Sequence, residues 1–202
     1  MHKHNKTHLK ASDNLCYSCN SKAKAFEELD YEELKEISDH KVHLQFKKGE
    51  TIAKQGAFVT HILFLKKGFV KLYKEVDYRS NLIISLHTSG KILGLASLFT
   101  NNHFQYSVSA LDDSFVCAID RDVIENRLRE NGEFASKVLQ SVNKDIQLCR
   151  DKLVSLSMKQ LNGRLADTLL YLSDEIYKSD NFELKLSRRD LAEMSGMSTM
   201  SV

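Results

Sequence analysis

The stretch that decides the fold is KKGETIAKQGAFVTHILFLKKGFVKLY, residues 47–73. It consists of short apolar or alternating runs separated by glycines, and the same texture extends over residues 42–119. Five of the eight glycines lie in this region: Gly49, Gly56, Gly68, Gly90 and Gly94. Glycine supplies the backbone angles of tight turns, and short strands at nearly regular spacing are typical of an antiparallel barrel or sandwich. We therefore predict an antiparallel β-domain here.

Composition excludes several classes of protein. The chain has 202 residues and a net charge of only +2, so any DNA contact has to come from a local basic patch. No apolar run is long enough to span a membrane, and the first residues, MHKHNKTHLKASDN, lack the apolar segment of a secretory signal. We expect a cytoplasmic protein without membrane contact. Its four cysteines are then candidates for metal binding, redox chemistry or packing rather than disulfides.

The two ends of the β-domain are flanked by different patterns. Residues 1–24 are basic and nearly free of large apolar side chains, which predicts a mobile leader. Apolar residues at helical spacing follow in FEELDYEELKEIS, residues 26–38, and predict a short amphipathic helix. After residue 121 the pattern is helical again, and NFELKL, residues 181–186, is predicted to be a strand.

A long apolar stripe marks the helix predicted over residues 133–157. Its members follow one another in steps of four or three residues, close to the seam of a coiled coil. They are Val138, Val142, Ile146, Cys149, Leu153 and Leu156. The simplest partner for such a stripe is a second copy of the chain, which predicts a homodimer; packing on the chain's own barrel is the alternative. Cys149 is expected to pack there as a small apolar residue.

The last residues, LSRRDLAEMSGMSTMSV (186–202), have the pattern of a helix-turn-helix. Ser187 is a plausible N-cap, Ala192 is small where a second helix crosses, and Gly196 closes the turn. Ser198 would cap a second helix with Thr199 and Met200 exposed near its start, where a recognition helix contacts bases. Arg188 and Arg189 are better placed for phosphates.

Together these features resemble the Crp/Fnr transcription regulators. Within that family they are most similar to the Fnr-like regulators of the Bacteroidetes type. The stretches that carry the resemblance are residues 47–73, GRLADTLLYLSDEIY (163–177) and residues 186–202. It implies an α+β chain with a β-roll sensor domain resembling a cyclic-nucleotide-binding jelly roll, a dimerisation helix and a winged helix-turn-helix. The predicted divisions are the leader with its CxxC (1–24), the β-roll (25–120), the dimerisation helix region (121–158) and the DNA-binding domain (159–202). The wing and the rest of the recognition helix are absent, so we expect a chain truncated within the motif.

The resemblance also identifies a sensor-pocket cassette, GLASLFTNNHFQYSVSA, residues 94–110. Relatives that bind cyclic AMP have a Glu after the glycine, for the ribose, and an Arg ten residues after it, for the phosphate. Here Leu95 follows Gly94, and Phe104 stands near the Arg position with Gln105 beside it. Burying a phosphate without a cation is strongly unfavourable, so we predict that the chain does not bind cyclic AMP.

Three cysteines match part of an Fnr-like ligand pattern. Cys16 and Cys19 have CxxC spacing and Cys117 matches the barrel ligand, while the remaining ligand position falls near Ala25. Four alternatives remain open: an iron–sulfur cluster completed by Asp13, His8 or water; a zinc ion with the same shortage of ligands; a thiol pair that oxidises to a disulfide; or no chemistry, with plain packing.

No catalytic triad, P-loop or nucleotide fingerprint appears, and we expect no enzyme. The expected function is a homodimeric regulator that binds operator DNA, contacts RNA polymerase as the family does, and senses oxygen or redox state. The alternative is a sensor and dimerisation module without sequence-specific DNA binding.

Overall fold

A computed structural model describes residues 15–19, 23–77 and 80–202. Its central unit is an antiparallel β-roll of two four-stranded sheets, with the strand orders β1-β8-β3-β6 and β2-β7-β4-β5. The strands are β1 (Lys41–Phe46), β2 (Thr51–Ala53), β3 (His61–Lys67), β4 (Phe69–Asp77), β5 (Ser80–Thr88), β6 (Lys91–Leu93), β7 (Ser107–Ala110) and β8 (Ser114–Asp120). The predicted antiparallel β-domain and the α+β class are confirmed.

The stretch at residues 47–73 forms these strands because its apolar residues line the interior and its glycines make the turns. Ile62, Leu65 and Val70 are fully buried. Gly68 joins β3 to β4 with a φ of +121°, and a Cβ there would lie 2.2 Å from the Ser114 side chain. Only glycine fits this position, because both the backbone angle and the close contact exclude a side chain.

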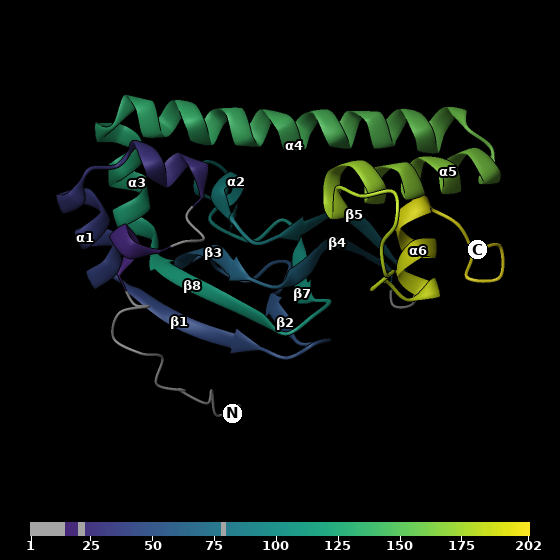
Figure 1. The fold of residues 1–202 in the computed structure, drawn as a ribbon, viewed down its shortest axis with the longest axis horizontal. Helices are drawn as coiled ribbons and strands as arrows, with labels where there is room; N and C mark the ends of the chain where they lie inside the picture. Colours follow the sequence, from purple (N-terminus) through teal and green to yellow (C-terminus); the bar gives the residue numbers. More distant parts are fainter. Residues whose placement is uncertain (1–14, 20–22, 78–79) are drawn as a thin grey trace.

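Six α-helices lie along the roll, and the described chain also has short helical turns over Lys24–Glu28 and Leu172–Tyr177. The α-helices are α1 (Tyr31–Asp39), the short α2 (Leu95–Leu98), α3 (Arg121–Glu130), α4 (Gly132–Met158), α5 (Leu161–Tyr171) and α6 (Arg188–Ser195). Figure 1 shows α4 running along the length of the molecule, with α1 and α3 near its first end and α5 near its second. Among the described residues, no helix is both long and apolar enough to span a membrane.

The C-terminal segment docks on the outer side of the β4–β5 hairpin. Leu186, Leu191 and Met194 share a second apolar core with β4 and β5. At its edge the Lys71 ammonium lies 2.5 Å from the Asp190 carboxylate. Asp190 also belongs to the capping box that begins α6. These contacts fix α6 against the roll.

The second helix of the predicted helix-turn-helix is not formed. Gly196 ends α6 in the left-handed conformation, as predicted. Residues 198–201 then make only a turn, in which the Ser201 amide donates to the Ser198 hydroxyl, the bond expected of an N-cap. Val202 is half-buried against the second core.

Two further expectations differ from the structure. Residues 181–186 are not a strand: Phe182 stacks on Tyr177 at 4.4 Å and Leu186 packs into the second core, while Leu184 between them is 40% exposed. Of the predicted mobile leader, residues 1–14 and 20–22 lie outside the described residues. The part around Cys16 is packed and forms a 3₁₀ turn over Cys16–Ser18. Its Cys16 amide donates to the Ser38 hydroxyl on α1.

Candidate functional site: a thiol cavity coupled to the long helix

The structure brings the three predicted cysteines to one small cavity. Cys16 and Cys19 come from the 3₁₀ turn, and Cys117 comes from β8 in the centre of its sheet. The cavity has a volume of about 10 Å³ and is otherwise lined by Phe26, Lys41, His43, Phe64, Lys66 and Ile119. The strand partners of Cys117 are His43 on β1 and Phe64 on β3. This convergence is not visible in the sequence, because it depends on strand pairing.

The ionisable side chains that line the cavity differ in their charge at neutral pH. The Lys41 ammonium donates to the Cys16 sulfur at 2.9 Å. Burial raises the pKa of the Cys117 thiol to about 11, so this sulfur is protonated at neutral pH when nothing is bound. Burial also lowers the pKa of His43, with Lys41 and Lys66 acting in the same direction. The imidazole is therefore neutral at neutral pH.

Sequence reasoning missed His43. Its Nε2 atom is buried and has no hydrogen-bond partner among the described residues. The ligands proposed from the sequence to complete a cluster, Asp13 and His8, lie outside those residues. A signal was present, since His43 lies in an alternating strand, but its register against Cys117 requires the fold.

The four-iron cluster implied by the resemblance does not fit this cavity. Such a cluster has four iron and four sulfide atoms and takes four thiolate ligands in its common form. The cavity offers three cysteines, and its 10 Å³ is about the space of one water molecule. Within the described part of the chain, no three His, Cys, Asp or Glu side chains are grouped closely enough to hold an ion as they stand.

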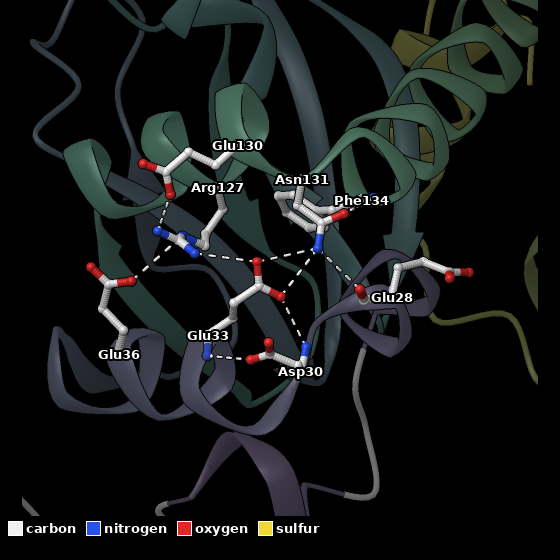
Figure 2. Close-up of polar contacts among 8 residues, drawn as sticks. All are labelled: Glu28, Asp30, Glu33, Glu36, Arg127, Glu130, Asn131 and Phe134. Carbon is white, nitrogen blue, oxygen red and sulfur yellow. Dashed lines mark hydrogen bonds and ion pairs between the residues drawn. The ribbon is translucent and has the colours of Figure 1, made fainter.

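A polar junction connects this end of the β-roll to the start of α4 (Figure 2). Glu33 on α1 is its centre: its carboxylate lies 3.2 Å from Arg127 on α3 and accepts hydrogen bonds from the Asn131 amide group at 3.1 and 3.2 Å. Asn131 also caps α4 by accepting from the Phe134 amide at 3.0 Å. Arg127 further pairs with Glu36 and Glu130. Glu33 on α1 therefore contacts both α3 and the residue that caps α4.

An aromatic contact runs beside the polar junction. Phe26, which lines the thiol cavity, stacks on Phe134 with 5.8 Å between ring centroids. Phe134 is fully buried in the first turn of α4. The cavity wall and the long helix thus share one packed pair, which the sequence did not reveal because these residues are 108 positions apart.

The predicted stripe on α4 is largely exposed, with one shift of register. Val138 is buried in the chain's own core, so it does not belong to the exposed stripe; Leu139, which is 60% exposed, takes its place. Ile146, Cys149 and Leu153 are exposed, while Val142 and Leu156 are half-buried. The corrected stripe is Leu139, Val142, Ile146, Cys149 and Leu153. Cys149 lies on this stripe, where it was expected to pack as a small apolar residue, and it is exposed in the single chain.

A cavity of about 480 Å³ lies on the other side of α4, where that helix, α5 and β5 meet. Its lining includes Lys152 and Tyr171. Burial lowers the pKa of Lys152 to about 8, and its ammonium donates to the Ile83 carbonyl. Tyr171 bonds to the backbone of Leu86 at 3.3 Å. The cavity therefore lies where residues of the β-roll, the long helix and the C-terminal segment meet.

The sensor-pocket cassette is filled by its own side chains. Gly94 begins α2 in the left-handed conformation, and both Leu95 and Phe104 are buried in the core. The Phe104 ring lies 3.2 Å from the place that a Cβ on Gly94 would take. The Gln105 side-chain amide donates to Asn101 and to the His103 carbonyl. The apolar ring of Phe104 therefore lies near the position at which relatives that bind cyclic AMP have the Arg for the phosphate.

The predicted DNA-contacting residues lie at the surface of the C-terminal segment. Arg188 and Arg189 are exposed on the first turn of α6, and Arg189 pairs with Glu193 at 2.8 Å. Ser198, Thr199 and Met200 are exposed in the turn after Gly196. Both groups are accessible to a partner.

Residues 43–131 match the family model of the cyclic nucleotide-binding domain. The chain as a whole is similar to regulators of the Crp/Fnr kind. It is 21% identical over 179 residues to the fumarate and nitrate reduction regulatory protein of Vibrio cholerae, covering 87% of this chain and 70% of the relative.

Solved structures of regulators share its fold. FixK2 from Bradyrhizobium japonicum aligns with a TM-score of 0.71 and 20% identity over 80% of each chain. A crp/fnr-family transcriptional regulator from Eubacterium rectale aligns with a TM-score of 0.73 and 18% identity, over 88% of this chain and 82% of that one. The resemblance read from the sequence is confirmed.

Proposed function

We propose that the protein is a cytoplasmic, homodimeric transcription regulator that binds operator DNA and has no enzymatic activity. The observation that carries this proposal is the exposed stripe on α4 in a chain related to Crp/Fnr regulators. The heptad spacing from Leu139 to Leu153 fits a parallel pair of helices in a two-fold dimer. Such a pair would place two C-terminal segments for two successive major grooves, with RNA polymerase as the partner that the family implies.

The signal would enter at the thiol cavity rather than at the cyclic-nucleotide cassette. Phe104 fills the cassette region, and neither Leu95 nor Phe104 can bind a phosphate. In contrast, the thiol cavity is joined to α4 through Phe26 and Phe134 and through Glu33 and Asn131. A change at Cys16, Cys19 or Cys117, of redox state or of bound metal, would shift the population of two dimer arrangements.

The test is to recover DNA bound to the tagged protein from its own cells and to sequence it. We expect an enriched palindromic motif whose half-sites are separated by about 10 base pairs or a multiple of it. A Leu153→Asp variant, which places a charge in the stripe, is expected to lose the palindromic enrichment. Uniform recovery of DNA by both proteins would contradict the proposal.

A further inference from the structure

We propose that Cys16, Cys19, Cys117 and His43 form a tetrahedral site for a single thiophilic divalent cation, Zn²⁺. The inference goes beyond the proposed regulator, because it assigns a mononuclear metal site and a histidine ligand. It rests on the position of His43, on its unpartnered nitrogen, and on the size and charge of the cavity.

The four side chains approach from two directions. Cys117 and His43 are directly opposite each other on the antiparallel strands β8 and β1, so their side chains are on the same face of the sheet. Cys16 and Cys19 lie on the turn that covers this cavity, where the Cys19 amide donates to the Cys16 carbonyl at 3.3 Å. A CxxC turn above two cross-strand ligands supplies the three-sulfur, one-nitrogen set that structural zinc accepts.

The nitrogen of His43 is the second, independent observation. Buried polar atoms normally have a partner, and a buried imidazole Nε2 without one among the described residues requires an explanation. A neutral imidazole is the form that binds a metal, and this side chain lines the same cavity as the three sulfurs. A cation in the cavity would give Nε2 its partner.

The size and charge of the cavity favour one ion. Its 10 Å³ suits a single atom, and zinc lies 2.0–2.3 Å from nitrogen and sulfur ligands in proteins. Three thiolates and one divalent cation carry one net negative charge. Lys41, whose ammonium contacts the Cys16 sulfur, and Lys66, which also lines the cavity, oppose that charge.

Metal binding requires a rearrangement of these side chains, because the described residues contain no three such ligands grouped closely enough to hold an ion. The Cys16 sulfur would exchange its contact with Lys41 for the metal, and each thiol would release its proton to solvent as it becomes a ligand. Such closure on binding is usual, since metal sites are seldom preformed without the ion.

The experiment measures metal content and coordination in the whole protein. The chain is purified anaerobically, and zinc, iron and acid-labile sulfide are quantified. Zinc is then replaced by Co²⁺, whose visible and near-ultraviolet bands report tetrahedral thiolate coordination. The same measurements are made on His43→Ala, on His43→Cys, and on the matched control His40→Ala, an exposed histidine three residues away. Circular dichroism confirms that each variant folds.

We expect one zinc per chain in the wild type and in His40→Ala. His43→Ala should bind zinc at least about 10-fold more weakly, since even outer ligands of metal sites have effects of this size. His43→Cys should recover binding and gain thiolate-to-cobalt absorption, which a purely structural role for His43 would not produce. DNA capture is independent of these readouts, so either proposal can fail alone.

Three results would overturn the proposal: no stoichiometric metal in the wild type, unchanged affinity in a folded His43→Ala, or iron with equal sulfide in place of zinc. The last would show that the cavity expands to hold a cluster.

Discussion

The two halves of α4 carry apolar residues at similar spacing but bury them differently. In the first half Phe134 is fully buried and Val138 is buried beside it in the chain's own core. In the second half Leu153 and Val154 are 64% and 58% exposed, and Met158 is 81% exposed. The first half is also capped by Asn131 and joined to α1 and α3 by the junction in Figure 2.

The difference shows that one helix serves two purposes. Its first half is an internal element whose stability comes from its own chain, so it can receive a movement of α1. Its second half leaves large apolar side chains exposed, which indicates a partner.

The largest effect is expected at Phe134. Phe134→Ala removes a fully buried ring that stacks on Phe26 and should destabilise the chain by about 4 kcal/mol. Urea unfolding followed by circular dichroism measures it. Val154→Ala, in the second half of α4 and exposed, should cost less than about 1 kcal/mol. Similar losses in both variants would contradict the division of α4.

Arg127 tests the polar junction. Its guanidinium is mostly buried among Glu33, Glu36 and Glu130, so Arg127→Ala leaves carboxylates without their cation and should cost about 3 kcal/mol. Arg129→Ala is the matched control on the same helix. Arg129 is 72% exposed and pairs only with Glu125 among the described residues, so its loss should cost below about 1 kcal/mol. Equal losses would mean that the junction contributes nothing specific.

Leu153 tests the second half of α4. Leu153→Asp should weaken self-association by about 30-fold, the effect of losing about 2 kcal/mol at a central interface residue. It should leave the unfolding of the monomer nearly unchanged, since Leu153 is exposed within the chain. Sedimentation equilibrium measures the first quantity and urea unfolding of dilute protein the second. Unaltered association would remove the stripe from the interface.

A smaller effect is expected where α6 meets the β-roll. Burial alone would raise the pKa of Asp190, but hydrogen bonds from Lys71 and Ser187 outweigh it and lower the pKa below its usual value. The carboxylate therefore stabilises the folded chain above its unfolded pKa of about 3.9, and this contribution is lost as the pH falls through the folded value. Asp190→Asn should cost about 1 kcal/mol at pH 7. The two proteins should approach equal stability in acid; a gap that persists below pH 3 would contradict this assignment.

Much of the fold could be predicted because its signals are local. The glycines at residues 47–73 predict turns within that same stretch. The capping box and Gly196 predict the two ends of α6. The position of Val138 was wrong by one residue, because the boundary between the core face and the exposed face of α4 is set by what packs beneath it.

The rest of the site depends on long-range pairing. His43 is a candidate metal ligand because the pairing of β1 with β8 places it opposite Cys117, and this pairing is not visible in the sequence. Glu33 and Asn131 look like ordinary helix-end residues, and their contact requires α1 and α3 to meet. The strand predicted at residues 181–186 failed for the same reason, because alternation cannot show whether a partner strand exists.

The most direct test of the divided helix uses Cys149. This thiol is exposed on the stripe between Ile146 and Leu153. In a parallel pair of helices it would face its own copy near the two-fold axis, within the Cα separation that a disulfide requires. Mild oxidation of the purified protein, followed by non-reducing electrophoresis, should give a covalent dimer that Cys149→Ser abolishes and Cys19→Ser leaves intact. A monomeric mass by light scattering, with no cross-link through Cys149, would contradict the central claim that a second copy covers the second half of α4.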